Sequence, residues 1–167
     1  GVGAIYLRDD HHDNIISGCS IRHTGIGGIW LYNGVQRGNP TYPNARCEFN
    51  IITNCLVRDI GEVLTPAVAG AGIQLISVSD SEVSHCDISD CARYAVTLRG
   101  NWLQHNPSPT DNGLHYTTNN RIHHIRATDC LQDSGDAGIV HAAGVNISGG
   151  ANVNIFEQLL ISGAYAD

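Results

Sequence analysis

Hydrophobic and polar residues alternate in short runs along the whole chain, and the same runs recur. A motif of the form N-x-I-x-x-C-x-I begins at Asn14, Asn50, Ser81, Asn120 and Asn154, starts that are 36, 31, 39 and 34 residues apart. A second motif, G-I-x-L, falls between these and begins at Ala4, Gly28, Gly72, Ala95 and Gly138. Periods of ~20–50 residues indicate solenoids or propellers. Each period holds three short strands and leaves no room for a strong helix. The pattern therefore predicts an all-β fold, a right-handed parallel β-helix of about four to five coils.

The length of 167 residues predicts one domain that spans residues 1–167. Strand residues open the chain and a coil closes it, and neither end carries the polar cap that solenoids use to protect their terminal strands. We therefore expect the chain to be part of a longer β-helix. Alternatively, it stacks end to end on a second copy.

Composition restricts the partners. The net charge of −7 argues against a nucleic-acid or anionic-membrane partner, because those surfaces attract a basic stripe. No apolar run approaches the ~18 residues of a membrane-spanning helix, and no signal-peptide pattern is present. The 19 glycines and the absence of Met suit tight turns and thin buried strands.

The six cysteines favour a buried ladder of free thiols over disulfides or a metal site. Cys19, Cys55 and Cys86 share one register of the repeat, Cys91 and Cys130 share another, and no C-x-x-C is present. Residues in the same register of neighbouring coils stack at ~4.8 Å. Cys47 falls in a predicted loop, so we expect it to be the thiol that reacts fastest.

Two further rows of the repeat have structural interpretations. The residue before each cysteine position is of a type that tolerates a left-handed backbone in four of five coils: Gly18, Asn54, His85, His124 and Gln158. We expect this row to bend each coil between two strands. The polar residue that opens each first motif is expected to hydrogen-bond from coil to coil or to turn backbone.

The outer face of the G-I-x-L strands is the candidate binding surface. Strict alternation points two rows outward: Tyr6, Trp30, Gln74, Thr97 and Val140, then Arg8, Tyr32, Ile76, Arg99 and Ala142. Aromatic faces beside hydrogen-bond donors suit stacked sugar rings, so Tyr6, Arg8, Trp30, Tyr32, Gln74 and Arg99 are candidate substrate contacts. Alternatively, the aromatic side chains only pack against loops or a neighbouring chain. Insertions at residues 33–43, 61–70 and 99–118 would form walls beside this face.

Acidic residues recur at two kinds of position. Asp59, Asp90 and Asp129 share one register with His23, and they either cap turns or form an array of carboxylates that raise one another's pKa. Asp133 and Asp136 lie at the corner that enters the last G-I-x-L strand, and Asp111 lies in the longest insertion. Asp9 is four coils from Asp136, about 19 Å at ~4.8 Å per coil, whereas glycosidase carboxylates lie ~5–9.5 Å apart. Asp136 therefore needs Asp133 or Asp111 as its partner.

Histidine pairs occur at His11-His12 and His123-His124. Strand alternation is expected to place the two rings of each pair on opposite faces, which makes them poor chelates. We therefore predict no metal and no other cofactor.

These residues resemble the pectin-lyase-like right-handed β-helix superfamily over essentially the full length. Within residues 50–144, the segments 55–68, 83–90 and Asp133-Ser134-Gly135-Asp136-Ala137-Gly138-Ile139 look like carbohydrate-active β-helix proteins of glycoside hydrolase family 141. That family uses an Asp-Asp-Ala-Gly-like segment for one catalytic carboxylate and an Asp one coil later for another. The resemblance implies the first role for Asp136 and a location outside the cell or in the periplasm. Here Ser134-Gly135 separates the two acids, and the segment resembling the second motif, residues 5–10, lies at the opposite end.

Three functions follow as hypotheses. The first is a glycoside hydrolase that acts on a complex polysaccharide, with Asp136 and either Asp133 or Asp111 as the catalytic carboxylates. The second is a polysaccharide lyase or uronate-binding enzyme in which Arg99 or a histidine neutralises the substrate carboxylate. The third is a non-catalytic solenoid used for assembly or adhesion.

Overall fold

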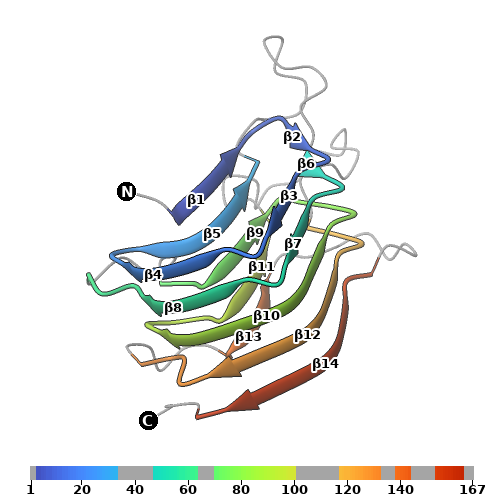
Figure 1. The fold of residues 1–167 in the computed structure, drawn as a ribbon. Coiled ribbons are helices and arrows are strands. Elements are labelled where there is room, and N and C mark those ends of the chain that lie inside the picture. The colour runs from blue at the N-terminus through green and yellow to red at the C-terminus, as the bar shows by residue number, and fades with distance from the viewer. Residues whose placement is uncertain are drawn as a thin grey trace.

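Parallel strands built from the two repeated motifs make up the fold. The computed structural model describes residues 3–33, 47–63, 70–100, 117–132, 138–143 and 153–163, and within these ranges it contains strands and no helix. Successive coils stack from β1 at the amino-terminal end to β14 at the other (Figure 1). The architecture is a parallel β-helix, as the repeat predicts.

The G-I-x-L motifs form the first sheet. Its five strands are all parallel and run in the order β1 (Gly3–Arg8), β5 (Gly27–Tyr32), β9 (Ile73–Ile76), β11 (Val96–Arg99) and β13 (Val140–Ala143). Each neighbour in this order comes from the next coil, so residues in one register form a row across the sheet.

The N-x-I-x-x-C-x-I motifs form the second sheet. Its path is β14 (Ile155–Ser162), β12 (Arg121–Thr128), β10 (Glu82–Cys91), β7 (Ile51–Thr53) and β3 (Ile15–Ser17), and it is joined by β4 (Ser20–Thr24) and β8 (Leu56–Ile60). A small third sheet pairs β2 (His11–His12) with β6 (Cys47–Glu48).

The core lies between the sheets and consists of the inward rows that alternation predicts. Ile29, Leu31, Ile73, Leu75 and Leu98 are fully buried from the first sheet. Ile52, Val83, Ile88 and Ile122 are fully buried from the second. Neighbouring coils thus bury one another's aliphatic side chains.

Left-handed backbone conformations bend each coil at fixed positions. The predicted row does so in every coil, with φ between 52° and 66°, at Gly18, Asn54, His85, His124 and Gln158. A second row, five residues further along, has the same conformation at His23, Asp59, Asp90, Asp129 and Gly163. Asn, Asp and His are enriched among non-glycine residues with positive φ, which accounts for their recurrence at these corners.

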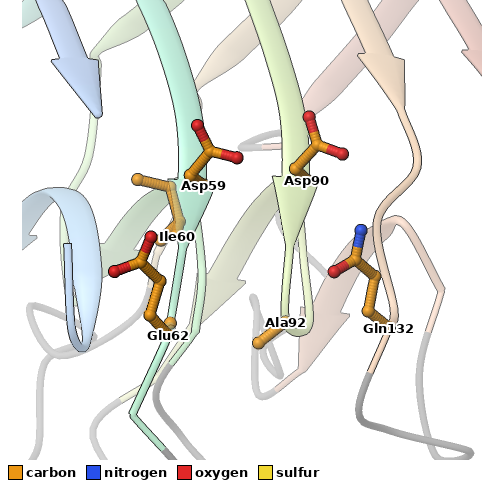
Figure 2. Close-up of a pocket in the computed structure, with 7 residues that line it drawn as sticks. Asp59, Ile60, Glu62, Asp90, Ala92 and Gln132 are labelled. Atoms are coloured by element: carbon orange, nitrogen blue, oxygen red, sulfur yellow. The ribbon is translucent and has the colours of Figure 1, made fainter. Parts of the chain in front are cut away.

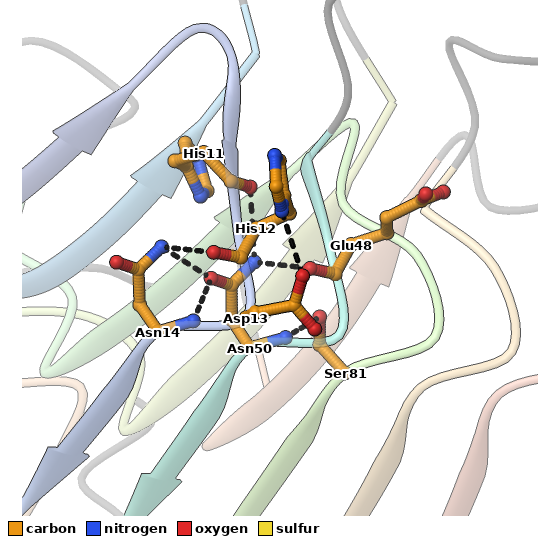
Figure 3. A network of polar contacts seen from close by, with 7 residues as sticks. All are labelled: His11, His12, Asp13, Asn14, Glu48, Asn50 and Ser81. Atoms are coloured by element: carbon orange, nitrogen blue, oxygen red, sulfur yellow. Dashed lines mark hydrogen bonds and ion pairs between the residues drawn. The ribbon is translucent and has the colours of Figure 1, made fainter.

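The polar residues that open the second-sheet motifs form a hydrogen-bonded ladder along the stack, as expected. Figure 3 shows its first part, where Asn14 Nδ2 donates to Asn50 Oδ1 at 2.9 Å. The backbone N–H of Asn50 donates to Ser81 Oγ at 3.0 Å, and the backbone N–H of Ser81 donates to Asn120 Oδ1 at 3.0 Å. Asn120 Nδ2 continues to Asn154 Oδ1 at 3.0 Å. The ladder therefore ties all five coils together.

All six cysteines are free, and five are buried. The register of the second sheet aligns Cys19, Cys55 and Cys86 in neighbouring coils. The expectation for Cys47 is wrong, because it lies in β6 opposite His11 and is 4% exposed. Burial raises the pKa of both Cys47 and Cys86 to about 12. Cys19, in the first coil, is the most exposed thiol.

Cys19 should therefore react first with a thiol reagent, because only the thiolate is nucleophilic and the other thiols are shielded. Titration of the native protein with a chromogenic disulfide should give one fast equivalent. Cys19→Ser should remove the fast phase, and the matched Cys47→Ser variant should retain it. Fast labelling of Cys55 or Cys86 would contradict the buried ladder.

The last described strand, β14, forms an edge of the second sheet. Phe156 and Ile161 pair with the inward-facing Ile122 and Ala127 but are themselves 36% and 45% exposed. Unpaired strand edges promote association with another strand. This edge would carry the contact that the sequence predicts, either with further coils of the same protein or with a second copy.

Candidate functional site

The outer face of the first sheet brings together most of the predicted substrate contacts. The strand register aligns one outward row as Tyr6, Trp30, Gln74, Thr97 and His141, and the next as Arg8, Tyr32, Ile76, Arg99 and Ala143. The prediction for the last coil is wrong by one residue. Val140 aligns with the inward-facing Val96, so His141 and Ala143 replace Val140 and Ala142 on the outer face.

Three aromatic side chains cluster at the β1–β5 end of this face. The Tyr6 ring meets Trp30 edge to face at 6.4 Å between centroids and lies 6.3 Å from Tyr32. All three rings are half-buried. The absence of a side chain at Gly27 leaves room for the indole, because a Cβ at this position would collide with Trp30. We call Tyr6, Trp30 and Tyr32 the aromatic platform.

Arg8 borders the aromatic platform. Its side chain is exposed, and its Nε lies 3.1 Å from Asp9 Oδ2. Burial raises the pKa of the Tyr6 hydroxyl, so this group remains a neutral hydrogen-bond donor at neutral pH.

Polar side chains occupy the other end of the face, and they are buried on β9 and β11 and half-buried on β13. Gln74 is 1% exposed and Arg99 is 5% exposed. Arg99 Nη2 donates to the Tyr94 hydroxyl at 2.8 Å. The Tyr94 ring stacks on His141 at 4.7 Å, and His141 Nδ1 lies 3.2 Å from Thr97 Oγ1. We call these five residues the polar cluster.

Several buried polar atoms in this cluster lack a hydrogen-bond partner: Gln74 Oε1, Arg99 Nε and Arg99 Nη1. A buried donor or acceptor without a partner costs about 1–3 kcal/mol, and more when the group is charged. A ligand rich in hydroxyl or carboxylate groups, or ordered water, would satisfy these atoms.

Sequence reasoning missed two members of the polar cluster. Tyr94 precedes β11 and folds over its outer face, and His141 enters the outer row only when the β13 register is corrected. The composition of the segment could have indicated Tyr94, since a large aromatic beside a short strand seldom remains fully exposed.

The candidate catalytic residues Asp111, Asp133 and Asp136 lie outside the described residues. Gln132, which directly precedes Asp133 in the chain, is described and lines a pocket of about 210 Å³. This pocket lies at the corner where coils leave the second sheet, and its lining comprises Asp59, Ile60, Gly61, Glu62, Asp90, Ala92 and Gln132.

Carboxylates dominate that pocket. Asp59 and Asp90 lie at equivalent positions of neighbouring coils and point the same way, with Glu62 and Gln132 nearby (Figure 2). His23 Nδ1 lies 2.9 Å from Glu62 Oε1 and 3.8 Å from Asp59 Oδ2. These two acids, Glu62 first, raise the pKa of His23.

The backbone gives Asp59 and Asp90 a structural reason to be aspartates, because both have left-handed conformations at a coil corner. The Asp90 carboxylate accepts a hydrogen bond from the Ser89 hydroxyl at 2.8 Å. The conformation of the backbone thus accounts for the residue type at this row. Their carboxylates remain available to a ligand in the pocket.

The expectation that His123 and His124 point to opposite faces is wrong. His124 has a left-handed backbone, with φ of 52°, which interrupts strand alternation at this corner. The two Nδ1 atoms lie 2.7 Å apart as a result.

The stacked parallel strands and the polar ladder together define a parallel β-helix. The family model described as "right handed beta helix region" matches residues 1–166, so the chain belongs to this family. Comparisons with curated proteins and with solved structures each gave no significant match. In the described ranges no helix is long and apolar enough to cross a membrane.

Proposed function

We propose that this β-helix binds a complex polysaccharide along the outer face of its first sheet and hydrolyses it. The observation that carries the proposal is the arrangement of this face. The aromatic platform lies at one end, and the polar cluster with unpartnered buried atoms lies at the other. Gln74 on β9 pairs with Trp30 on β5, so the polar cluster begins one strand, ~4.8 Å, from the aromatic platform and continues across β11 and β13.

Sugar rings fit such a face for a physical reason. Their C–H faces are apolar and can stack on aromatic rings, while their edges carry hydroxyl groups that need hydrogen-bond partners. Trp30, supported by Gly27, offers a preorganised surface that loses little conformational entropy on binding. A glycan lying across the strands would stack on the aromatic platform, and the buried donors and acceptors of β9 and β11 would reach it only after the cover over them opens.

Tyr6→Ala and Trp30→Ala should each weaken polysaccharide binding about tenfold or more, since one buried aromatic contact contributes about 1–3 kcal/mol. Affinity electrophoresis in gels that contain a panel of plant and microbial polysaccharides would measure the effect. Phe49→Ala is the matched control, because Phe49 is 53% exposed and directly follows β6, a strand of the small third sheet. Equal retardation of all three variants and the wild type would contradict the proposed binding face.

The hydrolytic step is assigned to Asp136, with Asp133 or Asp111 as the second carboxylate. The support is the resemblance of residues 133–139 to the catalytic segment of glycoside hydrolase family 141. The proposal includes a location outside the cell or in the periplasm, where such polysaccharides occur. If binding is retained but no substrate is turned over, the chain is a non-catalytic glycan-binding solenoid instead.

A polysaccharide lyase or uronate-binding enzyme is the second candidate, and Arg99 favours it. Its guanidinium is buried, keeps one contact with Tyr94 and has two unpartnered nitrogen atoms. A guanidinium binds a carboxylate through two parallel hydrogen bonds, which suits a uronate.

Two measurements separate the lyase from the hydrolase. A lyase produces an unsaturated sugar that absorbs in the near ultraviolet, whereas a hydrolase does not. Arg99→Lys should weaken binding to uronate polymers selectively, because lysine cannot reproduce the paired hydrogen bonds. The lyase would be excluded if Arg99→Lys lost the same affinity for neutral and acidic polymers and no product absorbing in the near ultraviolet was formed.

A further inference from the structure

Three histidines from neighbouring coils meet at one corner of the second sheet, away from the glycan face. His85 and His124 occupy the same left-handed position of β10 and β12, and His123 directly precedes His124. The rings of His85 and His124 stack at 4.5 Å, and that of His123 lies 5.6 Å from His85. One ligand nitrogen from each ring lies within 4.8 Å of the others.

The left-handed corner is what brings these rings together. In a regular strand His123 and His124 would project to opposite faces, but the φ of 52° at His124 turns both rings toward one side. The same conformation at His85, one coil earlier, places its ring beside that of His124. The fold thus gathers three imidazoles that are up to 39 residues apart in the sequence.

A carboxylate supports the buried member of the trio. Glu82 Oε1 lies 3.2 Å from His123 Nε2, and the His123 ring is 6% exposed. This contact is at ion-pair distance, and Nε2 makes no hydrogen bond in its present orientation. A small rotation of the ring would direct Nε2–H at the carboxylate and leave Nδ1, the atom that faces His124, unprotonated and able to bind a metal. Metal-binding histidines commonly direct the second ring N–H to a carboxylate in this way.

We propose that His85, His123 and His124 form a binding site for Zn²⁺, with Glu82 orienting His123. Imidazole nitrogen suits zinc, and three protein ligands leave the fourth tetrahedral position to water. At Zn–N distances of ~2.0–2.1 Å, neighbouring ligand nitrogens lie about 3.3 Å apart. The 2.7 Å pair of Nδ1 atoms must open slightly, and the exposed His85 and His124 rings can rotate to meet the ion.

The site would add a link between two coils that already interact through strand pairing, the core and the polar ladder. β10 and β12 are neighbours in the second sheet, and the ion would bridge them at an exposed corner. A ligand that binds only the folded state raises its stability by mass action. Zinc should therefore act as a clamp between the two coils, independently of glycan binding.

Isothermal titration of the tag-free, chelator-treated chain with ZnCl₂ tests the proposal. We expect one Zn²⁺ per chain and a higher melting temperature in its presence, with no such shift from MgCl₂, which prefers oxygen ligands. His85→Ala and His124→Ala should each weaken zinc binding about tenfold or more. Glu82→Gln should weaken it by at most about 100-fold, because removal of a carboxylate that supports a metal-binding histidine typically costs about 10–100-fold in affinity. Both histidines are exposed, so neither variant should unfold.

His12→Ala is the matched control, because His12 is an exposed histidine that contacts Asp13 and lies outside the trio. It should leave the zinc affinity unchanged. The proposal is overturned if the wild-type chain binds no zinc, or if His85→Ala and His124→Ala bind it as tightly as the wild type. An equal loss in His12→Ala would also overturn it, since zinc would then be distributed over surface histidines.

Discussion

Asp136→Asn is expected to abolish glycoside hydrolysis while leaving the fold intact. Asparagine keeps the size of the side chain and its hydrogen bonding but removes the negative charge and the exchangeable proton. A catalytic acid, base or nucleophile needs one or both of these. Loss of an acid–base group typically lowers the rate by about 10²–10⁴-fold. The rate of turnover of an activated aryl glycoside, compared with the wild type, measures the effect.

Asp90→Asn is the matched control for this experiment. Asp90 has a left-handed backbone, which asparagine tolerates equally well, and Asn54 has that conformation at another corner. Removing an ordinary surface charge changes stability by about 0.5 kcal/mol or less, so this variant should remain active and folded. If Asp90→Asn is inactive and Asp136→Asn is active at equal melting temperatures, the catalytic carboxylates are those of the pocket around Asp59 and Asp90.

The coil architecture could be predicted because each coil repeats the same physical constraints. Inward aliphatic positions, a left-handed corner residue and a polar ladder residue recur at nearly constant spacing. Asn54 shows why this works, since the residue type suits the backbone conformation whatever its neighbours are. Local preference and tertiary packing agree along most of the chain, so the sequence is informative about the fold.

The errors occur where alternation is ambiguous or interrupted. Ile139 and Val140 are both apolar, so the pattern alone could not determine which of them aligns with Val96. A shift of one residue reverses the face of every side chain in a strand. The register that points Val140 outward therefore points His141 inward, opposite to the observed arrangement. At His124 a single left-handed residue breaks the alternation, which brings two adjacent rings to one side.

The sequence could predict which residues of β1, β5, β9 and β11 lie in the outer rows, but not how deeply each is buried. Tyr6, Trp30, Gln74 and Arg99 all belong to the outer rows, as expected from the G-I-x-L motif. Gln74 and Arg99 are nevertheless almost fully buried. Burial on the outside of a solenoid depends on what folds over the sheet, as Tyr94 does, and strand periodicity contains no information about such contacts.

Asn50→Leu should destabilise the fold by about 3 kcal/mol, because Asn50 is 1% exposed and each buried polar group left without a partner costs about 1–3 kcal/mol. Its Nδ2 donates to the carbonyls of His11 and Glu48 at 3.3 and 3.1 Å, and its Oδ1 accepts from Asn14 (Figure 3). Leucine has a similar volume but satisfies none of these groups. In a chain of this size the melting temperature should fall by about 6–12 °C.

Asn50→Ser and Asn14→Ala supply the comparison. Serine occupies the same ladder position in the next coil, where the Ser81 hydroxyl donates to the carbonyl of Ser79 at 2.8 Å. Asn50→Ser should therefore recover part of the lost stability, although its shorter side chain also leaves a small cavity. Asn14 is only half-buried in the first coil, so water can replace its partners and Asn14→Ala should cost about 1 kcal/mol or less. Thermal unfolding followed by circular dichroism measures the melting temperatures. We expect them to decrease in the order wild type, Asn14→Ala, Asn50→Ser, Asn50→Leu. A melting temperature for Asn50→Leu equal to that of Asn14→Ala would mean that the ladder only fills space, and that its hydrogen bonds do not hold the coils together.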